Sequence, residues 1–358
     1  MESDVADTIT LIVHTYFIYI MKDVRNYSLL SHNTFGIDAS CGRYAEAATA
    51  GEVAQFVKSY NAGSDELLVI GGGSNLLLTG DYAGTVFHSA IRGMNVVGED
   101  ADSVLLRVGS GEVWDDVVAY CVANGMYGAE NLSAIPGEAG ASAVQNIGAY
   151  GAEVKDIIYK VEAVEIATGN TVEIMPEDCD YSYRHSRFKS EWKNKFIITY
   201  VTYRLSKHYN PRLDYGNIRA ELVAKGIDNP TAEQLRQVIT DIRDAKLPDP
   251  KVEGNAGSFF MNPIVDRSHY ESLVAQYPDM PHYDVDAERV KIPAGWMIDR
   301  CGWKGKSVGR AGVHSRQALV LVNRGGAEGK DIIHLCNLVR ADVKARFGID
   351  IHPEVNFV

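Results

Sequence analysis

A run of glycines followed by two polar residues is the first segment whose composition suggests chemistry. It follows a short apolar stretch, residues 67–70, and it reads Gly71, Gly72, Gly73, Ser74, Asn75. Glycines let backbone amides approach an anion closely, and the serine and asparagine side chains add donors. The segment is therefore expected to cradle a pyrophosphate, although a tight turn without a ligand explains it equally well on its own. Because it is not GxGxxG followed by a helix, it does not predict a Rossmann dinucleotide site.

A second segment rich in small residues runs from Ile135 to Gly151, with Gln145 and Asn146 as its polar points. Such a backbone could press against a flat ring and offer amide groups to it. The alternative is a glycine-rich loop that binds nothing. Two segments of this kind in one chain favour a ligand.

Two charged residues could act on a carboxylate substrate. Arg184 lies among aromatic residues in Tyr181–Ser186 and could serve as a fixed cation. Glu354 follows a proline near the end of the sequence. Taken alone, each reads as an ordinary solvated surface charge.

A third group of polar residues follows the sequence Pro248-Asp249-Pro250. Ser258 lies in a Gly-Ser turn that would expose its hydroxyl, and Lys246 and Lys251 could bind phosphate. No GxSxG elbow surrounds the serine, so a hydrolase nucleophile is not expected.

Local patterns predict the helices that position these residues. Apolar residues at helical spacing indicate helices over 51–60, over 113–122 with Val113 on the apolar side, and over 332–343 with Gly348 as the C-terminal cap. Thr231 and Gln234 form a capping box for a helix that must end before Pro248.

Strands are predicted between these helices. The apolar and β-branched runs indicate strands over 67–70, 104–108 and 196–205. Residues 159–166 and 171–174 flank Gly169-Asn170, which predicts a hairpin.

The bulk composition limits the class of protein. The chain has 358 residues, 46% hydrophobic and 23% charged, which is typical of a soluble protein of two or three domains. Its net charge of −12 argues against nucleic-acid binding, which requires a basic face. Five scattered cysteines without a CxxC pair predict reduced thiols in a cytosolic protein and no metal site.

The apolar run Ile9–Met21 is too short to span a bilayer comfortably and lacks the flanking features of a signal peptide. We therefore expect no membrane insertion. We hypothesise that translation begins at Met21 and that residues 1–20 are an extension created by the assigned gene start. An intact mass of the natively expressed protein that includes these residues would contradict this.

The order of the motifs adds a resemblance that no single motif carries. The blocks are residues 33–36, 70–77, 135–151, 181–189, 246–263, 294–305, 313–323 and 352–358. Together they resemble the UDP-N-acetylenolpyruvoylglucosamine reductases over Ser28–Val358. Leu213–Gly216 resembles the substrate-covering loop of the longer form of this family, with Tyr215 as its tyrosine.

The resemblance implies an α+β fold. Its FAD-binding part has the two subdomains of the vanillyl-alcohol-oxidase (PCMH) type, and a separate α+β domain binds substrate. The implied division is 1–20 as an extension, 21–90 as the first FAD subdomain, 91–247 joined by 349–358 as the second, and 248–348 as the substrate-binding domain. A monomer in the cytoplasm is expected.

The resemblance also implies two half-reactions with non-covalent FAD. NADPH reduces the flavin, and the reduced flavin transfers hydride to C3 of UDP-N-acetylglucosamine enolpyruvate, in the same site and in turn. Ser258 is implied as the proton donor to C2, with Arg184 and Glu354 holding the carboxylate and stabilising the enolate. An ionised carboxylate would repel that enolate, so we expect Glu354 to be protonated or to orient a donor.

The remaining roles implied by the family motifs are binding roles. The FAD pyrophosphate would contact Gly71, Gly72, Gly73, Ser74 and Asn75. The flavin would contact Gln145, Asn146, Gly148, Ala149, Tyr150 and Arg243. Substrate or nicotinamide would contact Tyr183 and Asn262, and the substrate diphosphate would contact Lys246 and Tyr215.

Two residues depart from the family pattern, and two other functions stay open. Arg300 and Asn356 stand where glutamine and arginine are expected, so Asn356 receives no role and Arg300 could supply compensating charge. A flavin oxidase of the same fold would explain the glycine segments but not Ser258 and Glu354. A nucleotide-sugar-binding module without chemistry would be colourless.

Overall fold

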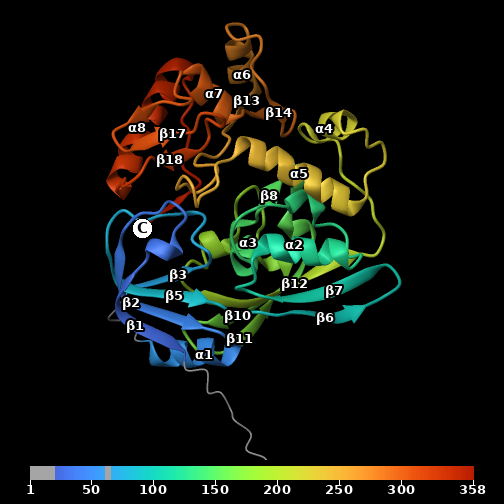
Figure 1. Cartoon of the computed structure of the whole chain (residues 1–358), viewed down its shortest axis with the longest axis vertical. Helices are drawn as coiled ribbons and strands as arrows, with labels where there is room; N and C mark the ends of the chain where they lie inside the picture. The colour runs from blue at the N-terminus through green and yellow to red at the C-terminus, as the bar shows by residue number, and fades with distance from the viewer. Residues whose placement is uncertain (1–20, 61–65) are drawn as a thin grey trace, which may run out of the picture.

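The computed structural model describes residues 21–60 and 66–358 (Figure 1). The predictions about the apolar run before Met21 lie outside these residues. Within the described part, no helix is long and apolar enough to cross a membrane.

A four-stranded sheet with the order β1-β2-β5-β3 opens the fold. Its members are β1 (Lys22–Ser28), β2 (Ser40–Ala47), β3 (Leu67–Ile70) and β5 (Tyr82–Ser89). Helix α1 (Ala50–Ser59) packs Val53 and Phe56 against Phe87 of this sheet, and Thr49 caps its first turn. The predicted helix over 51–60 and the strand over 67–70 are confirmed.

A five-stranded antiparallel sheet with the order β11-β10-β12-β7-β6 follows. Its strands are β6 (Met94–Glu99), β7 (Ser103–Gly109), β10 (Ile158–Glu165), β11 (Thr171–Ile174) and β12 (Phe196–Ser206). The predicted hairpin pairs Val161 with Ile174 and Val164 with Thr171, so it is confirmed.

Helices α2 (Trp114–Ala123), α3 (Ala139–Gln145) and α5 (Ala232–Lys246) lie together next to this sheet (Figure 1). The expectation that Val113 belongs to the apolar side of α2 is wrong. Val113 is the N-cap in extended backbone and is 38% exposed, because the helix begins only at Trp114. The capping box of Thr231 and Gln234 on α5 is confirmed.

Helix α3 was not predicted, because its segment reads as a glycine-rich loop. It is a short helix of small residues that ends at Asn146 in the left-handed conformation (φ +47°). The chain then forms the small hairpin of β8 (Gly148–Ala149) and β9 (Ala152–Glu153). The short 3-10 helices are η1 (Leu30–His32), η2 (Glu130–Leu132), η3 (Val154–Asp156), η4 (Pro176–Asp178) and η5 (Arg187–Lys189).

The C-terminal part follows α4 (Ile218–Ala224) and α5, and an irregular segment over 247–263 leads into it. Its strands form two three-stranded sheets: β13 (Ile264–Asp266), β15 (Arg289–Lys291) and β14 (Tyr283–Asp284), then β16 (Ser307–Val308), β17 (Ala311–Val313) and β18 (Leu321–Asn323). Its helices are α6 (Arg267–Val274), α7 (Ala294–Arg300) and α8 (Gly329–Phe347). The predicted cap of α8 is confirmed, since Gly348 is left-handed at φ +69°.

The C-terminal strand returns to the first predicted FAD-binding segment of the described chain. Strand β19 (Asn356–Phe357) pairs in parallel with β4 (Leu76–Leu77). One hydrophobic core joins Phe35 and Leu77 to Phe259 and Phe347. Residues on both sides of the predicted domain boundary at 247–248 contribute to this core. The predicted division into domains stays a prediction.

Candidate active site

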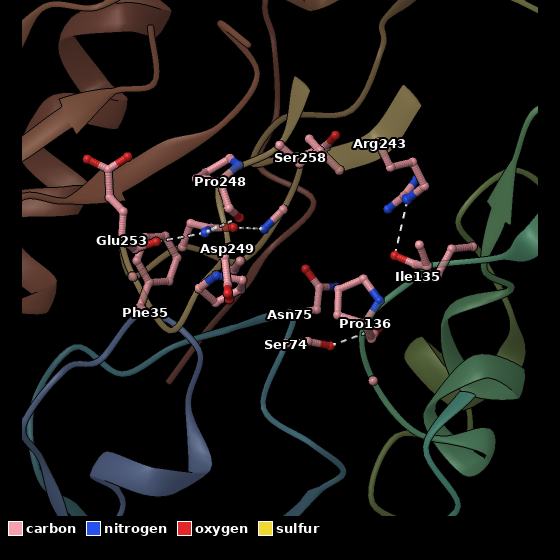
Figure 2. A pocket seen from close by; sticks show the side chains of 18 of the residues that line it. Phe35, Ser74, Asn75, Ile135, Pro136, Arg243, Pro248, Asp249, Glu253 and Ser258 are labelled. Carbon is pink, nitrogen blue, oxygen red and sulfur yellow. Dashed lines mark hydrogen bonds between the residues drawn. The ribbon is translucent and has the colours of Figure 1, made fainter. Parts of the chain in front are cut away.

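A cavity of about 1420 Å³ lies where the two glycine-rich segments meet the segment over 243–258. Ligand sites typically measure roughly 300–1,000 Å³, so this cavity has room for more than one ligand. In Figure 2, Ser74, Asn75 and Pro136 face Pro248, Asp249 and Ser258. Sequence segments separated by more than 100 positions thus form opposite walls.

Arg184, Gln145 and Glu354 form a charged cluster in this cavity. Arg184 Nε lies 2.9 Å from Glu354 Oε1. The same oxygen accepts a hydrogen bond of 2.8 Å from Gln145 Nε2. Two predicted catalytic residues and one predicted cofactor residue therefore meet around a single carboxylate, which forms an ion pair with Arg184 and accepts a hydrogen bond from Gln145.

The guanidinium of Arg184 is held from its other edge by the β8–β9 hairpin. Arg184 Nη2 donates to the carbonyl of Gly148 at 2.7 Å. Arg184 itself has left-handed backbone (φ +56°), which is costly for a residue with a side chain and clusters at functional sites. Ala134 and Tyr150, which also line the cavity, share this conformation.

Ser258 is exposed on the cavity wall, in a turn that neighbouring residues hold. The buried side chain of Asn255 accepts from the backbone amide of Gly257 and donates to the carbonyls of Pro248 and Glu253. The Ser258 hydroxyl has no hydrogen-bond partner among the described residues and is free to serve a ligand. Asn255 was missed by sequence reasoning, and its place in the block 246–263 was the only signal for it.

The three glycines 71–73 do not line the cavity, whereas Ser74 and Asn75 do. Gly73 has φ +65°, and a Cβ there would lie 2.0 Å from the carbonyl oxygen of His32. Ser74 Oγ donates to the carbonyl of Pro136 at 3.2 Å (Figure 2), which ties the two glycine-rich segments together. The requirement for glycine at 73 is therefore steric.

In the second glycine-rich segment, too, only some of the predicted cofactor residues line the cavity. Gln145, Gly148 and Tyr150 line the cavity, whereas Asn146 and Ala149 do not. The Asn146 side chain is buried and bonds to the Glu153 carboxylate, the Ser182 carbonyl and the Lys155 amide. It fixes the turn that carries its neighbours.

The predicted substrate residues Tyr183, Tyr215 and Asn262 lie outside the cavity lining and group separately. The ring of Tyr215 stacks on Tyr283, with centroids 5.7 Å apart and planes within 9°. Lys291 Nζ lies 4.6 Å from the Tyr183 ring centroid. Burial lowers the pKa of this lysine, with an opposing effect of Glu153. Lys291 and Tyr283 were missed because their segment carries no motif.

Arg243 and Lys246 reach the cavity from the last turns of α5. Arg243 Nε donates to the carbonyl of Ala134 at 3.1 Å, as the dashed line near Ile135 shows in Figure 2. Burial lowers the pKa of Arg243, and the neighbouring Tyr150 opposes this. Lys246 is exposed.

A second cation stands behind Arg184. Lys189 Nζ donates to the Arg184 carbonyl at 2.9 Å. Burial lowers the pKa of Lys189, while the charge of Glu354 raises it. This lysine was not singled out from the sequence, although it closes the block over 181–189.

The two departures from the family pattern lie apart from this cluster. Arg300 is exposed on α7 and pairs with Asp279, so it does not add charge to the cavity. Asn356 Nδ2 donates to the Asn75 carbonyl at 3.1 Å and fastens the C-terminal strand beside the cavity wall.

Comparisons with known proteins agree with this arrangement. Residues 42–175 match the family described as an FAD binding domain, and residues 249–358 match the C-terminal domain of UDP-N-acetylenolpyruvoylglucosamine reductase. The predicted α+β fold with an FAD-binding part is confirmed.

Several relatives cover almost the whole chain. A UDP-N-acetylenolpyruvoylglucosamine reductase of Bacteroides fragilis is 58% identical over 93% of this chain and 99% of its own length. One of Paraburkholderia xenovorans is 44% identical over 92% and 95%.

A solved structure supports the fold. The crystal structure of the reductase from Thermus caldophilus aligns with a TM-score of 0.65 at 21% identity, over 94% of this chain and 98% of that one. Together with the sequence relatives, these matches show that this chain is an enzyme and belongs to the UDP-N-acetylenolpyruvoylglucosamine reductase family.

Proposed function

We propose that this enzyme reduces UDP-N-acetylglucosamine enolpyruvate to UDP-N-acetylmuramate, with FAD as bound cofactor and NADPH as electron donor. This reaction would place it in peptidoglycan precursor synthesis in the cytoplasm, acting as a monomer. The observation that carries the proposal is the cluster of Arg184, Gln145 and Glu354 in one cavity with Ser258.

The residues of the cavity fit FAD. Arg243 is a desolvated cation without an ion-pair partner among the described residues, and such a charge is costly unless a ligand balances it. A Cβ on Gly137 would lie 3.0 Å from Ser74 Oγ, so a side chain at this position would crowd Ser74 where the two glycine-rich segments meet at the cavity. When bound there, the flavin would supply the hydride-transfer chemistry.

The proposed residue roles follow from charge. Once C3 of the enolpyruvyl group has accepted hydride, negative charge develops on C2 and on the adjacent carboxylate. The Arg184 guanidinium would hold that carboxylate, because a fixed cation stabilises a developing anion without reorganisation. Glu354 would orient Arg184 and Gln145, which is the second of the two roles expected for it.

Ser258 would then donate its hydroxyl proton to C2. A serine hydroxyl is a weak acid, so this role rests on position. The turn anchored by Asn255 holds the hydroxyl on the cavity wall without a competing partner. Lys246, Tyr215, Tyr183 and Asn262 are proposed to bind the nucleotide-sugar or the nicotinamide.

An absorbance assay tests this function directly. Purified yellow protein is mixed with NADPH, and UDP-N-acetylglucosamine enolpyruvate is added last. We expect NADPH to be oxidised rapidly only after that addition. Equal NADPH consumption without it would indicate an oxidase, and no consumption by an FAD-loaded protein would overturn the function.

A further inference from the structure

A buried histidine stands between two carboxylates beside the predicted pyrophosphate cradle. His88 Nδ1 lies 2.9 Å from Glu46 Oε2, and His88 Nε2 lies 3.0 Å from Glu138 Oε2. His88 and Glu138 are each 8% exposed. Nothing in the proposed reaction uses this group of side chains.

The position of Glu138 presents an electrostatic conflict. It lines the cavity, and its Oε2 would lie 3.2 Å from a Cβ placed on Gly71. The Glu138 carboxylate therefore lies next to the turn where the FAD phosphates are expected. A carboxylate and a phosphate that are close together in a partly desolvated site repel each other strongly. Among the residues that the structure describes, His88 is the only cationic partner of Glu138.

We propose that His88 is a positioning residue for the cofactor: its protonated ring neutralises Glu138 and so permits the FAD phosphates to bind beside Ser74 and Asn75, which line the cavity together with Glu138. This inference rests on the proposed function, since it assumes FAD in the cavity. It makes cofactor affinity depend on the charge of a side chain in β5 that does not line the cavity.

The surroundings of His88 determine the direction of the pH effect. Four titratable groups face it: Glu46 and Tyr44 from β2, His32 from η1, and Glu138 before α3. Burial lowers the pKa of His88, but the hydrogen bonds and charges of Glu138 and Glu46 outweigh it and raise the pKa. Burial and the charge of His88 lower the pKa of His32, so His88 carries the proton.

FAD affinity should consequently fall as pH rises through the raised pKa of His88. The affinity of apoprotein is measured by titration with FAD, following flavin fluorescence, from below pH 6 to above pH 9. We expect the dissociation constant to increase roughly tenfold or more, because loss of the ring's charge leaves the Glu138 carboxylate to repel the FAD phosphates.

Three variants separate the effect of the Glu138 charge on FAD affinity from that of the His88 charge. Glu138→Gln should bind FAD at least as tightly as wild type at low pH and more tightly at high pH, because no carboxylate is left there to repel the phosphates when the ring loses its proton. His88→Gln leaves the carboxylate unbalanced and should bind weakly at every pH. The double variant should recover the affinity, which a purely structural role of His88 would not allow.

Two further variants serve as controls. Glu46→Gln removes one charge that holds the proton, so the midpoint of the pH dependence should move to lower pH. His208→Gln removes an exposed histidine paired with Asp102 and should leave the curve unchanged.

The outcomes distinguish the two proposals. If wild type binds FAD with the same affinity across the range, or Glu138→Gln binds FAD no more tightly than wild type at high pH, the role of His88 is refuted while the cofactor site stands. If neither wild type nor any variant binds FAD at any pH, the proposed function itself fails. Should His88→Gln not fold, the Glu138→Gln and Glu46→Gln curves still decide.

Discussion

At the scale of single residues, Gly148 is where an added methyl group would most directly disturb the proposed chemistry. A Cβ there would lie 3.0 Å from Arg184 Nη1 and 2.9 Å from the Ala152 carbonyl oxygen. Gly148→Ala should therefore displace the Arg184 guanidinium and lower kcat/KM about tenfold or more, because small misplacements of a charged group are costly.

Steady-state kinetics of FAD-loaded protein would measure this effect. Gly80→Ala is the matched control, because nothing lies within 4 Å of a Cβ at that position. A Gly148→Ala enzyme with unchanged kcat/KM would show that the contact between Arg184 and Gly148 does not matter.

Ser258 allows the two half-reactions to be separated. Ser258→Ala should leave flavin reduction by NADPH nearly intact, because no proton donor to C2 is needed there. Oxidation of the reduced flavin by substrate should slow by roughly 10²–10⁴, the usual contribution of a positioned proton donor.

Rapid-mixing spectroscopy follows both half-reactions of this variant. Ser272→Ala, on α6, controls for the loss of a serine away from the cavity, since its hydroxyl donates to the His269 carbonyl within the same helix. Equal losses in both half-reactions of Ser258→Ala would argue against the proton-donor role.

At the scale of elements, α5 carries Arg243 and Lys246 at one end and its cap at the other. Thr231 Oγ1 accepts from the Gln234 amide, and Gln234 Oε1 accepts from the Thr231 amide. Thr231→Ala should lower the free energy of unfolding by about 1 kcal/mol, because helix N-H groups lose their partner.

Denaturant unfolding of apoprotein would measure this loss, with Thr231→Ser expected to retain most of the stability. Turnover should stay unchanged, because the cap lies three turns from Arg243. A Thr231→Ala protein as stable as wild type would mean that packing alone holds the first turn.

At the scale of the whole molecule, His88 should influence how stability depends on pH. A group whose pKa is raised by folding stabilises the protein fully below its unfolded pKa, near 6.5, and this stabilisation is lost as pH rises through the folded pKa. Between these values, wild-type apoprotein should lose more unfolding free energy than His88→Gln.

The comparison with His88→Gln is needed because burial lowers the pKa of His32. His32 therefore makes the free energy of unfolding rise with pH, opposite to the effect of His88. Thermal or denaturant unfolding at several pH values gives the two curves. Curves that run parallel across the window would show that folding does not change the protonation of His88.

The sequence by itself determined the elements whose signals are local. The strand over 67–70, the hairpin around Gly169-Asn170 and the caps at Thr231 and Gly348 were all predicted. Capping, turn chemistry and apolar periodicity depend on residues that are close in the sequence, so they can be recognised without knowledge of the fold. The family could also be recognised, because the order of its motifs is visible in the sequence without knowledge of their contacts.

Only the tertiary structure decided how distant segments meet. It placed Arg184 and Gln145 on one carboxylate of Glu354, kept Tyr183 and Tyr215 off the cavity wall, and put His88 against Glu138. Helix α3 was missed because the surrounding glycines mask the helical preference of its alanines, and a helix of seven residues is ordered only by packing, here against β12. Such contacts depend on one core shared by both ends of the chain, which no local pattern encodes.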